Sequence, residues 1–160
     1  MITIVLILLW VLLMVAVLIA LCRRVYYSNV YEFKDYEKTE IPYVTVDIQG
    51  NPMNMVVDTG CAVSLLNIPS ISNCELLYRK SNNKVTLSAV TSEGLNAGGI
   101  LVDFVIGKKK VTEEFFLHDT EDFANFNRMH GIHLHGLLGC SFFEKNNCSV
   151  DFKKHRLIVK

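Results

Sequence analysis

An acidic residue between an apolar segment and a glycine turn is the part of this sequence best suited to chemistry. Residues 55 to 57 are apolar, Asp58 follows them, and Thr59, Gly60 and Cys61 continue the chain. A carboxylate at the end of a strand can act as a general base or general acid toward water and a carbonyl group. Asp-Thr-Gly alone is weak support, because average composition yields one in roughly one chain in thirty of this length. The triplet therefore needs support from its surroundings.

Three histidines offer a second candidate site. His130, His133 and His135 form a His-x-x-His-x-His cluster, a pattern that suggests a bound metal and a metal-dependent hydrolase. On a strand or loop this spacing does not converge the rings as a helical His-x-x-x-His does, and the motif contains no carboxylate. Surface histidines that respond to pH, and ordinary loop residues, are the alternatives. The sequence therefore predicts no metal site and favours Asp58 as the reactive group.

The segments that follow Asp58 give the triplet its context. About 80 residues later comes Gly-Leu-Leu-Gly at 136 to 139, then two phenylalanines, then Cys-Ser-Val-Asp-Phe-Lys-Lys at 148 to 154. A glycine-bearing hairpin is expected between them, at residues 90 to 99. In this order and spacing, from residue 42 to residue 159, the chain resembles the retropepsin-like aspartic proteases, the single-lobe family that includes the retroviral enzymes.

This resemblance implies a fold and a mechanism. The fold is an all-β, retropepsin-like closed barrel with a flap hairpin. Catalysis in this family uses two carboxyl groups, one as the base that activates water and one as the acid that protonates the substrate carbonyl. Two carboxylates about 3 Å apart share a proton, because they cannot both ionise cheaply. Since the chain carries one such acid, the resemblance implies an obligate homodimer with Asp58 from each protomer, and no cofactor.

The resemblance also assigns roles to further residues. Thr59 would join the two loops at the dimer axis, Gly60 would present its backbone to water and substrate, and Cys61 would support the catalytic loop. Substrate would bind as an extended strand, with alternate side chains in apolar pockets. The flap would exclude water, and the hydrophobic-glycine motif would pack beneath Asp58. These two elements comprise Thr91, Ser92, Glu93 and Gly94 in the flap, and Leu137, Leu138 and Gly139 in the motif.

Three residues depart from the family pattern. Cys61 stands where alanine or serine is usual, which indicates either a conservative packing change or control by oxidation of a sulfur beside the carboxyl pair. Ala62 and Cys140 stand where retroviral members carry an acid and an arginine that pair with each other. Loss of both partners strands no buried charge, but it leaves open how the dimer is held. We expect membrane anchoring to compensate by raising the local concentration of protomers.

Alternating polarity predicts the strands that must position these residues. Val44, Val46 and Ile48 alternate with polar residues, a turn follows at 50 to 52, and a strand at 53 to 57 ends in Asp58. Many short strands with glycine turns indicate an all-β domain. The other elements expected are a short helix or irregular segment at 72 to 79, strands at 84 to 90, 99 to 106, 111 to 117, 148 to 152 and 155 to 159, a hairpin tip at 107 to 110 and a polar loop at 118 to 130.

Hydropathy divides the chain into two parts. Residues 1 to 22 carry no charged side chain, and the rest contains all 16 basic and 16 acidic side chains. This balance excludes a polybasic nucleic-acid binder and an acidic disordered tail, and the single apolar run excludes a transporter with many spans. From Ile2 to Cys22 a helix would be about 32 Å long, which matches a hydrocarbon core of about 30 Å. We expect a single-pass transmembrane anchor at 1 to 22; a cleaved signal peptide or a lipid-modified Cys22 is the alternative.

The expected organisation has three parts: the anchor, a juxtamembrane tether at 23 to 40 and the retropepsin-like domain at 41 to 160. Aromatic residues in the tether favour the headgroup layer. Arg23 and Arg24, with five cysteines that show no C-x-x-C spacing, favour the cytoplasmic face for the domain. The expected function is a membrane-anchored aspartic endopeptidase that cuts a protein or peptide near the same membrane. A catalytically silent, dimerising peptide-binding module of the same fold is the alternative.

Overall fold

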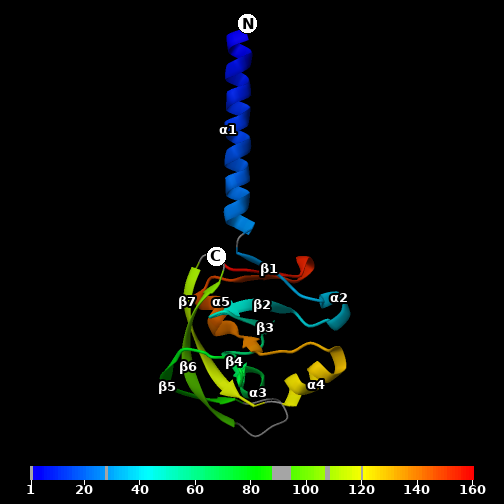
Figure 1. The fold of residues 1–160 in the computed structure, drawn as a ribbon, viewed down its shortest axis with the longest axis vertical. Helices are drawn as coiled ribbons and strands as arrows, with labels where there is room; N and C mark the ends of the chain where they lie inside the picture. Colours follow the sequence, from blue (N-terminus) through cyan, green and yellow to red (C-terminus); the bar gives the residue numbers. More distant parts are fainter. Residues whose placement is uncertain (1, 28, 88–94, 107–108, 120) are drawn as a thin grey trace.

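The polypeptide forms a β domain with a long helix at one end. The computed structural model describes residues 1–160 except 1, 28, 88–94, 107–108 and 120; side chains of 2–5, 23–27, 86–87 and 95–96 are also outside the described set. Helix α1 (Ile2–Tyr27) projects from the domain, whose strands lie in two sheets (Figure 1). Within the described part of the chain, no helix has the combined length and apolar character needed to cross a membrane.

Seven strands form the larger sheet, in the order β2-β3-β8-β4-β7-β6-β5. Neighbours are antiparallel except for the pairs β3–β8 and β4–β7, which run in parallel. The inward side chains of β2 and β3 are fully buried, which confirms the two strands predicted from alternation. The strands are β2 (Tyr43–Ile48), β3 (Asn51–Val57), β4 (Ser64–Asn67), β5 (Tyr78–Leu87), β6 (Leu95–Ile106), β7 (Lys109–His118) and β8 (Gly136–Leu138).

The larger sheet curls around its core (Figure 1). Gln49 lies in the turn after β2, and its side-chain amide donates to the carbonyl oxygens of Leu77 and Asp103 at 2.9 Å each. Its Oε1 accepts from the Leu77 N–H at 2.8 Å. These bonds connect the β2 edge of the sheet to the start of β5 and to β6. The mostly-β, curled architecture confirms the β class that was predicted. Among the described strands, β2 and β5 do not pair, so in place of the predicted closed barrel the Gln49 side chain connects the two edges of the sheet.

Strands β5, β6 and β7 are longer than alternation predicts. β5 begins at Tyr78 although the strand was expected from residue 84, because its first half is exposed and polar and shows no period of two. Lys109 and Lys110, expected in a hairpin tip, belong to β7. The rest of that tip, 107–108, lies outside the described residues, as does 88–90 of the expected strand.

One large apolar cluster fills the inside of the curl. Each large apolar side chain that becomes fully buried contributes about 1.5–3 kcal/mol. The cluster includes Leu138, which precedes the glycine of the hydrophobic-glycine motif. Its largest fully buried members are Ile48, Met53, Met55, Leu66, Ile106, Phe115, Leu138, Phe142 and Leu157. The core therefore anchors the segment predicted to support Asp58.

The smaller sheet contains a segment that was expected to be a tether. β1 (Val30–Glu32) pairs with β10 (Arg156–Ile158), which pairs with β9 (Ser149–Asp151), and both pairs are antiparallel. Phe33 is 7% exposed and belongs to the core cluster, and its N–H donates to the His155 carbonyl at 2.8 Å. A short helix, α2 (Tyr36–Thr39), follows. Residues 30 to 39 are therefore part of the domain, and a three-residue strand is too short to show its period in the sequence.

The region after β4 contains a helix that was not predicted, α3 (Ile68–Ile71). Of the segment 72 to 79, where a short helix or an irregular segment was expected, residues 72 to 77 are irregular and the last two belong to β5. Pro69 lies in the first turn of α3, where a missing N–H costs nothing and the fixed φ suits a helix start.

The predicted polar loop at 118 to 130 is wrong, because helix α4 (Glu121–His130) occupies most of it. Phe123 and Phe126 are three residues apart and pack in one cluster with Tyr43 and Leu134. Acidic residues in the first turn and basic residues in the last turn complement the helix dipole. The polar composition of the segment concealed the helical spacing of its two phenylalanines. The last two helices are α5 (Cys140–Lys145) and the 3-10 helix η1 (Phe152–Lys154).

Candidate active site

Asp58 lies directly after β3, at the tip of an exposed loop. Its N–H donates to the Leu138 carbonyl at 3.0 Å, which ties the residue to β8. Its Oδ1 accepts from the Gly60 N–H at 2.8 Å, which fixes the orientation of the carboxylate. Thr59 and Gly60 are exposed, whereas Asp58 is half-buried. The loop therefore presents an oriented carboxylate beside an open surface.

The hydrophobic-glycine motif lies against this loop. β8 runs parallel to β3, with Leu138 opposite Val57, and its Leu138 side chain is buried in the core. A Cβ on Gly139 would stand 2.2 Å from the Val63 carbonyl oxygen. The φ of −98° at Gly139 suits any residue, so space alone requires glycine here. Leu137 is half-buried and packs on the other side of the sheet, in a cluster with Leu65 and Phe116. The structure thus brings Leu137, Leu138 and Gly139 to the Asp58 loop.

Three further hydrogen bonds join the segment after Gly139 to the segment after Gly60. The Cys140 N–H donates to the Cys61 carbonyl at 2.8 Å, and the Ser141 N–H donates to the Ala62 carbonyl at 3.0 Å. The Gly139 N–H donates to Ser64 Oγ at 3.2 Å. A loop held by several hydrogen bonds between packed strands meets the requirement that a catalytic group sit on a rigid support.

Two of the residues that depart from the family pattern are found here: Cys61 lies in this loop, and Cys140 contacts it. Cys61 is half-buried beside the Leu65 cluster. Burial raises the pKa of the Cys61 thiol, and the nearby Asp58 adds to that rise against a bond from the Val63 backbone. A thiol that stays protonated reacts slowly, so the packing interpretation is favoured over a redox sensor. The Cys140 S–H donates to the Thr59 carbonyl at 3.2 Å, a contact that no sequence signal indicated.

Comparison with known proteins identifies the fold. No family profile matches the chain, and no curated protein matches its sequence. A solved structure, EIAV protease complexed with the inhibitor HBY-793, matches with a TM-score of 0.54 and 16% identity, over 72% of this chain and 97% of that chain. The chain has a retroviral-protease fold. At 16% identity the likeness is one of fold, so the chemistry must be argued from the residues of the site.

Within this retroviral-protease fold, β5 and β6 form the hairpin that the sequence assigns to the flap. The two strands pair antiparallel from Tyr78 opposite Val102 to Leu87 opposite Leu95, with a register shift between Lys80 and Lys84. The predicted flap-tip residues, Thr91, Ser92, Glu93 and Gly94, lie outside the described residues. The function of the tip therefore stays a prediction.

The three histidines make two separate ring contacts. The His133 and His135 ring centroids are 4.7 Å apart, and the centroids of the His130 and Phe126 rings are 4.5 Å apart. His135 Nδ1 accepts from the Asn54 N–H at 3.1 Å, and burial lowers the pKa of His135, with a smaller effect from His133. Among the described residues, no three potential ligands converge on one point. His135 instead satisfies a backbone donor of β3.

Proposed function

We propose that the protein is a homodimeric aspartic endopeptidase in which Asp58 of each protomer forms the catalytic pair. The observation that carries this proposal is the Asp58 carboxylate, oriented by the Gly60 N–H at 2.8 Å, at the end of β3 in a retroviral-protease fold. The chain contains one Asp-Thr-Gly, so a pair requires a second copy. Exposed Thr59 and Gly60 provide a surface on which the second loop can pack.

The mechanism follows from two carboxyl groups that share one proton. The ionised Asp58 accepts a proton from water as the water oxygen bonds to the scissile carbonyl carbon, and the partner's Asp58 protonates the carbonyl oxygen. Collapse of the tetrahedral intermediate then breaks the C–N bond, and the leaving nitrogen takes up a proton from the pair. No metal or cofactor enters this scheme. Substrate binds as an extended segment between the Asp58 loops and the β5–β6 hairpin, through main-chain hydrogen bonds.

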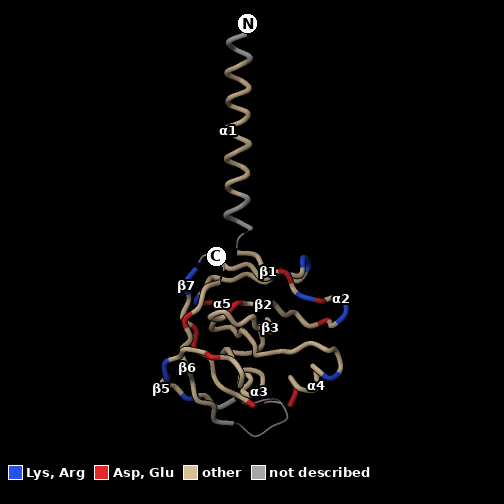
Figure 2. The backbone as a smooth tube through the Cα atoms, viewed as in Figure 1, with Lys and Arg blue, Asp and Glu red and all other residues tan. Residues whose placement is uncertain are grey.

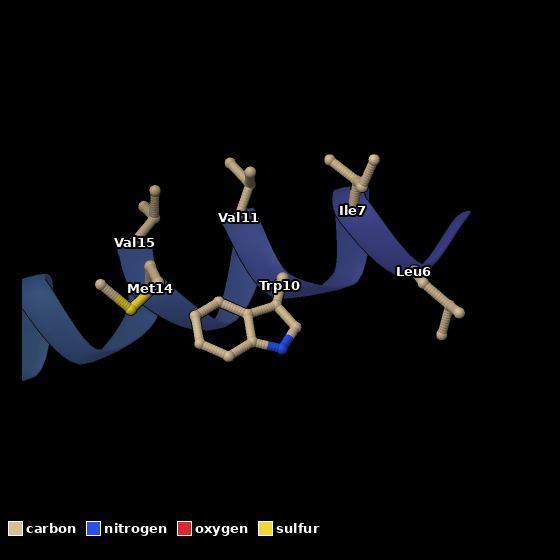
Figure 3. A pocket seen from close by; sticks show the side chains of 6 residues that line it. All are labelled: Leu6, Ile7, Trp10, Val11, Met14 and Val15. Atoms are coloured by element: carbon tan, nitrogen blue, oxygen red, sulfur yellow. The ribbon is translucent and has the colours of Figure 1, made fainter. Parts of the chain in front are cut away.

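We also propose that α1 anchors the protein in a membrane, with the domain on the cytoplasmic side. The described side chains of α1, those of 6–22, are too short a run to span a membrane by themselves, so this proposal rests on the sequence. The uncharged segment from Ile2 to Cys22 is longer, and a basic pair follows it. Apolar side chains project from α1 without burial in the domain, Trp10 being 68% exposed (Figure 3). Figure 2 shows charges of both signs on the domain and none on the described middle of α1. Extraction of membranes at alkaline pH tests this part of the proposal.

The distance between α1 and the domain limits the substrates available to an anchored enzyme. Because β1 begins at Val30, only residues 28 and 29 separate it from α1, and they extend over about 10 Å at most. The domain would therefore stay close to the membrane surface and cut segments near it. Confinement to a surface also raises the effective concentration of protomers, which favours the dimer.

Replacement of Asp58 by Asn tests the proposed activity. The full chain in detergent is mixed with a diverse peptide library between about pH 4 and 7.5, with a pepstatin-type inhibitor as a further control. Asp58→Asn keeps the shape of the side chain but cannot act as a base, so cleavage should fall about a hundredfold or more. Asp47→Asn is the matched control, because Asp47 is an exposed carboxylate on β2, outside the Asp58 loop and the β5–β6 hairpin. Equal cleavage by wild type and Asp58→Asn contradicts the proposal, and no cleavage by confirmed dimers favours the silent peptide-binding module.

A further inference from the structure

Glu113 is a carboxylate in the core that the proposed mechanism does not use. It lies on β7 with 2% of its surface exposed, on the inward face with Val111 and Phe115. Burial raises the pKa of Glu113, while hydrogen bonds from Ser64 and Ser141 and the charge of Lys145 oppose the rise. A carboxyl group at such a position is costly unless it is hydrogen-bonded.

The hydrogen bonds of Glu113 lead to the loop that carries Asp58. Ser64 Oγ donates to Glu113 Oε1 at 2.8 Å, and Ser141 Oγ donates to the same oxygen at 3.3 Å. Ser64 Oγ also accepts from the Gly139 N–H at 3.2 Å. Since a hydroxyl donates one hydrogen, the carboxylate directs the Ser64 hydrogen to itself and turns a lone pair toward Gly139.

The two serines belong to the two chain segments that support the catalytic loop. Ser64 begins β4, at the end of the segment that follows Asp58, and Ser141 lies in the first turn of α5, just after Gly139. Backbone bonds join the same two segments to each other, and Leu138 accepts from the Asp58 N–H at 3.0 Å. Glu113 therefore accepts hydrogen bonds from both the segment that follows Asp58 and the segment that follows Gly139. The positions of these two segments determine the position of Asp58.

We propose that Glu113 is a positioning residue that holds the Asp58 loop through Ser64 and Ser141. This inference deepens the proposed function and rests on it for any effect on catalysis. The charged and titratable groups that face Glu113 are Lys145 of α5, Cys148 beyond α5 and its neighbour Glu114. Hydrogen bonds to an ionised carboxylate are about twice as strong as those to a neutral acceptor, so the loop is held best when Glu113 is ionised.

Kinetics of three variants and one control variant test the assignment in the full chain. Glu113→Ala removes the acceptor, and a displacement of about 1 Å at the loop should lower kcat about a hundredfold with little change in KM. Glu113→Gln keeps a neutral acceptor and should recover most of the kcat lost in Glu113→Ala. In wild type, protonation of Glu113 should lower kcat as the pH becomes acidic, and Glu113→Gln should not show this decline. If Glu113→Ala does not fold, Ser141→Ala takes its place. It breaks only one of the two links, so its kcat should lie between that of wild type and the hundredfold loss expected for Glu113→Ala. Asp47→Asn, which removes an exposed carboxylate of β2 that also accepts a hydrogen bond, from the Gly50 N–H, should match wild type.

Amide hydrogen exchange separates this inference from the question of proteolysis. Peptides that cover residues 136 to 143 should exchange at least about tenfold faster in Glu113→Ala than in wild type, while peptides of β2 and β3 keep their rates. Unchanged exchange at 136 to 143 would overturn the assignment, as would equal acceleration of β2 and β3 or a kcat and pH profile of Glu113→Gln identical to wild type. If wild type cleaves no peptide, the proposed function fails, and the exchange result still decides the role of Glu113.

Discussion

Replacement of Gly139 by alanine should damage both stability and activity, because the position has no room for a methyl group. The new Cβ would stand 2.2 Å from the Val63 carbonyl oxygen, 2.5 Å from its carbon and 2.8 Å from the Cys61 carbonyl oxygen. Carbon atoms do not approach such atoms closer than 3.0 Å, so the backbone on one side must retreat by about 0.8 Å or more. All three atoms that the new Cβ would meet belong to the backbone, so the clash cannot be relieved by movement of a flexible side chain.

The size of the effect follows from that displacement. Overpacking of this kind costs about 1–3 kcal/mol or more, which lowers the Tm of a domain of this size by roughly 3 to 10 °C. A shift approaching 1 Å at the support of Asp58 should lower kcat about a hundredfold. Gly98→Ala is the control for the effect of a lost glycine on Tm, because a Cβ at Gly98 meets nothing within 4 Å and its φ is not in the left-handed region. Since Gly98 lies in the β5–β6 hairpin, cleavage is compared with wild type.

Thermal unfolding and peptide cleavage by the two variants provide the assay. The sole tryptophan, Trp10, lies on α1, so tryptophan fluorescence would report on that helix, and near-ultraviolet circular dichroism of the tyrosines is the better probe of the domain. Gly139→Ala should unfold at lower temperature than Gly98→Ala and lose activity beyond what its stability explains. A Tm equal to that of Gly98→Ala, together with cleavage equal to that of wild type, would refute the reasoning that close packing at Gly139 positions Asp58.

Two further outcomes are expected. Burial, helped by the bond from its hydroxyl to Asp35 Oδ2 at 2.8 Å, raises the pKa of Tyr43 to about 12 from 10.0. Because the folded state then holds the proton that the unfolded state loses, the free energy of unfolding should fall as pH rises from about 10 to 12. Tyr43→Phe should lower the free energy of unfolding by about 1 kcal/mol at neutral pH, and urea titrations of this variant should not show the fall between pH 10 and 12. If α1 is an anchor, the chain should remain in membranes after alkaline extraction, whereas lysines at Leu12 and Leu13, each costing about 2.5–3.5 kcal/mol at the centre of a span, should release it. Release of the wild-type chain would contradict anchoring.

Features encoded by short, regular patterns could be predicted from the sequence. The alternation in β2 and β3 is local, and so is the delivery of Asp58 by the end of β3. The hydrophobic-glycine motif could be placed beneath Asp58 only through resemblance, since the close approach of Gly139 to Val63 joins segments far apart in the chain. The fold class was therefore predictable, and the contacts that hold the loop were not.

Other features depend on tertiary partners that no local pattern reveals. β1 is three residues long and is defined by its pairing with β10 at the other end of the chain. Helix α4 is mostly polar, and its two phenylalanines matter because Tyr43 and Leu134 cover them. Glu113 follows a threonine and precedes another glutamate, so nothing in the sequence marks it as buried. Its environment exists only where β7, β4 and α5 meet.

The central claim is that one active site requires Asp58 from two chains, and mixtures of wild-type and Asp58→Asn chains test it most directly. The two proteins are mixed in detergent at equal concentration, allowed to exchange partners, and assayed for peptide cleavage per total protein. If the pair is shared across a two-fold axis, random pairing leaves about one quarter of the wild-type activity, because mixed dimers have a single catalytic carboxylate. Activity of about one half, in proportion to the wild-type chains present, would show that each chain acts alone and would contradict the account.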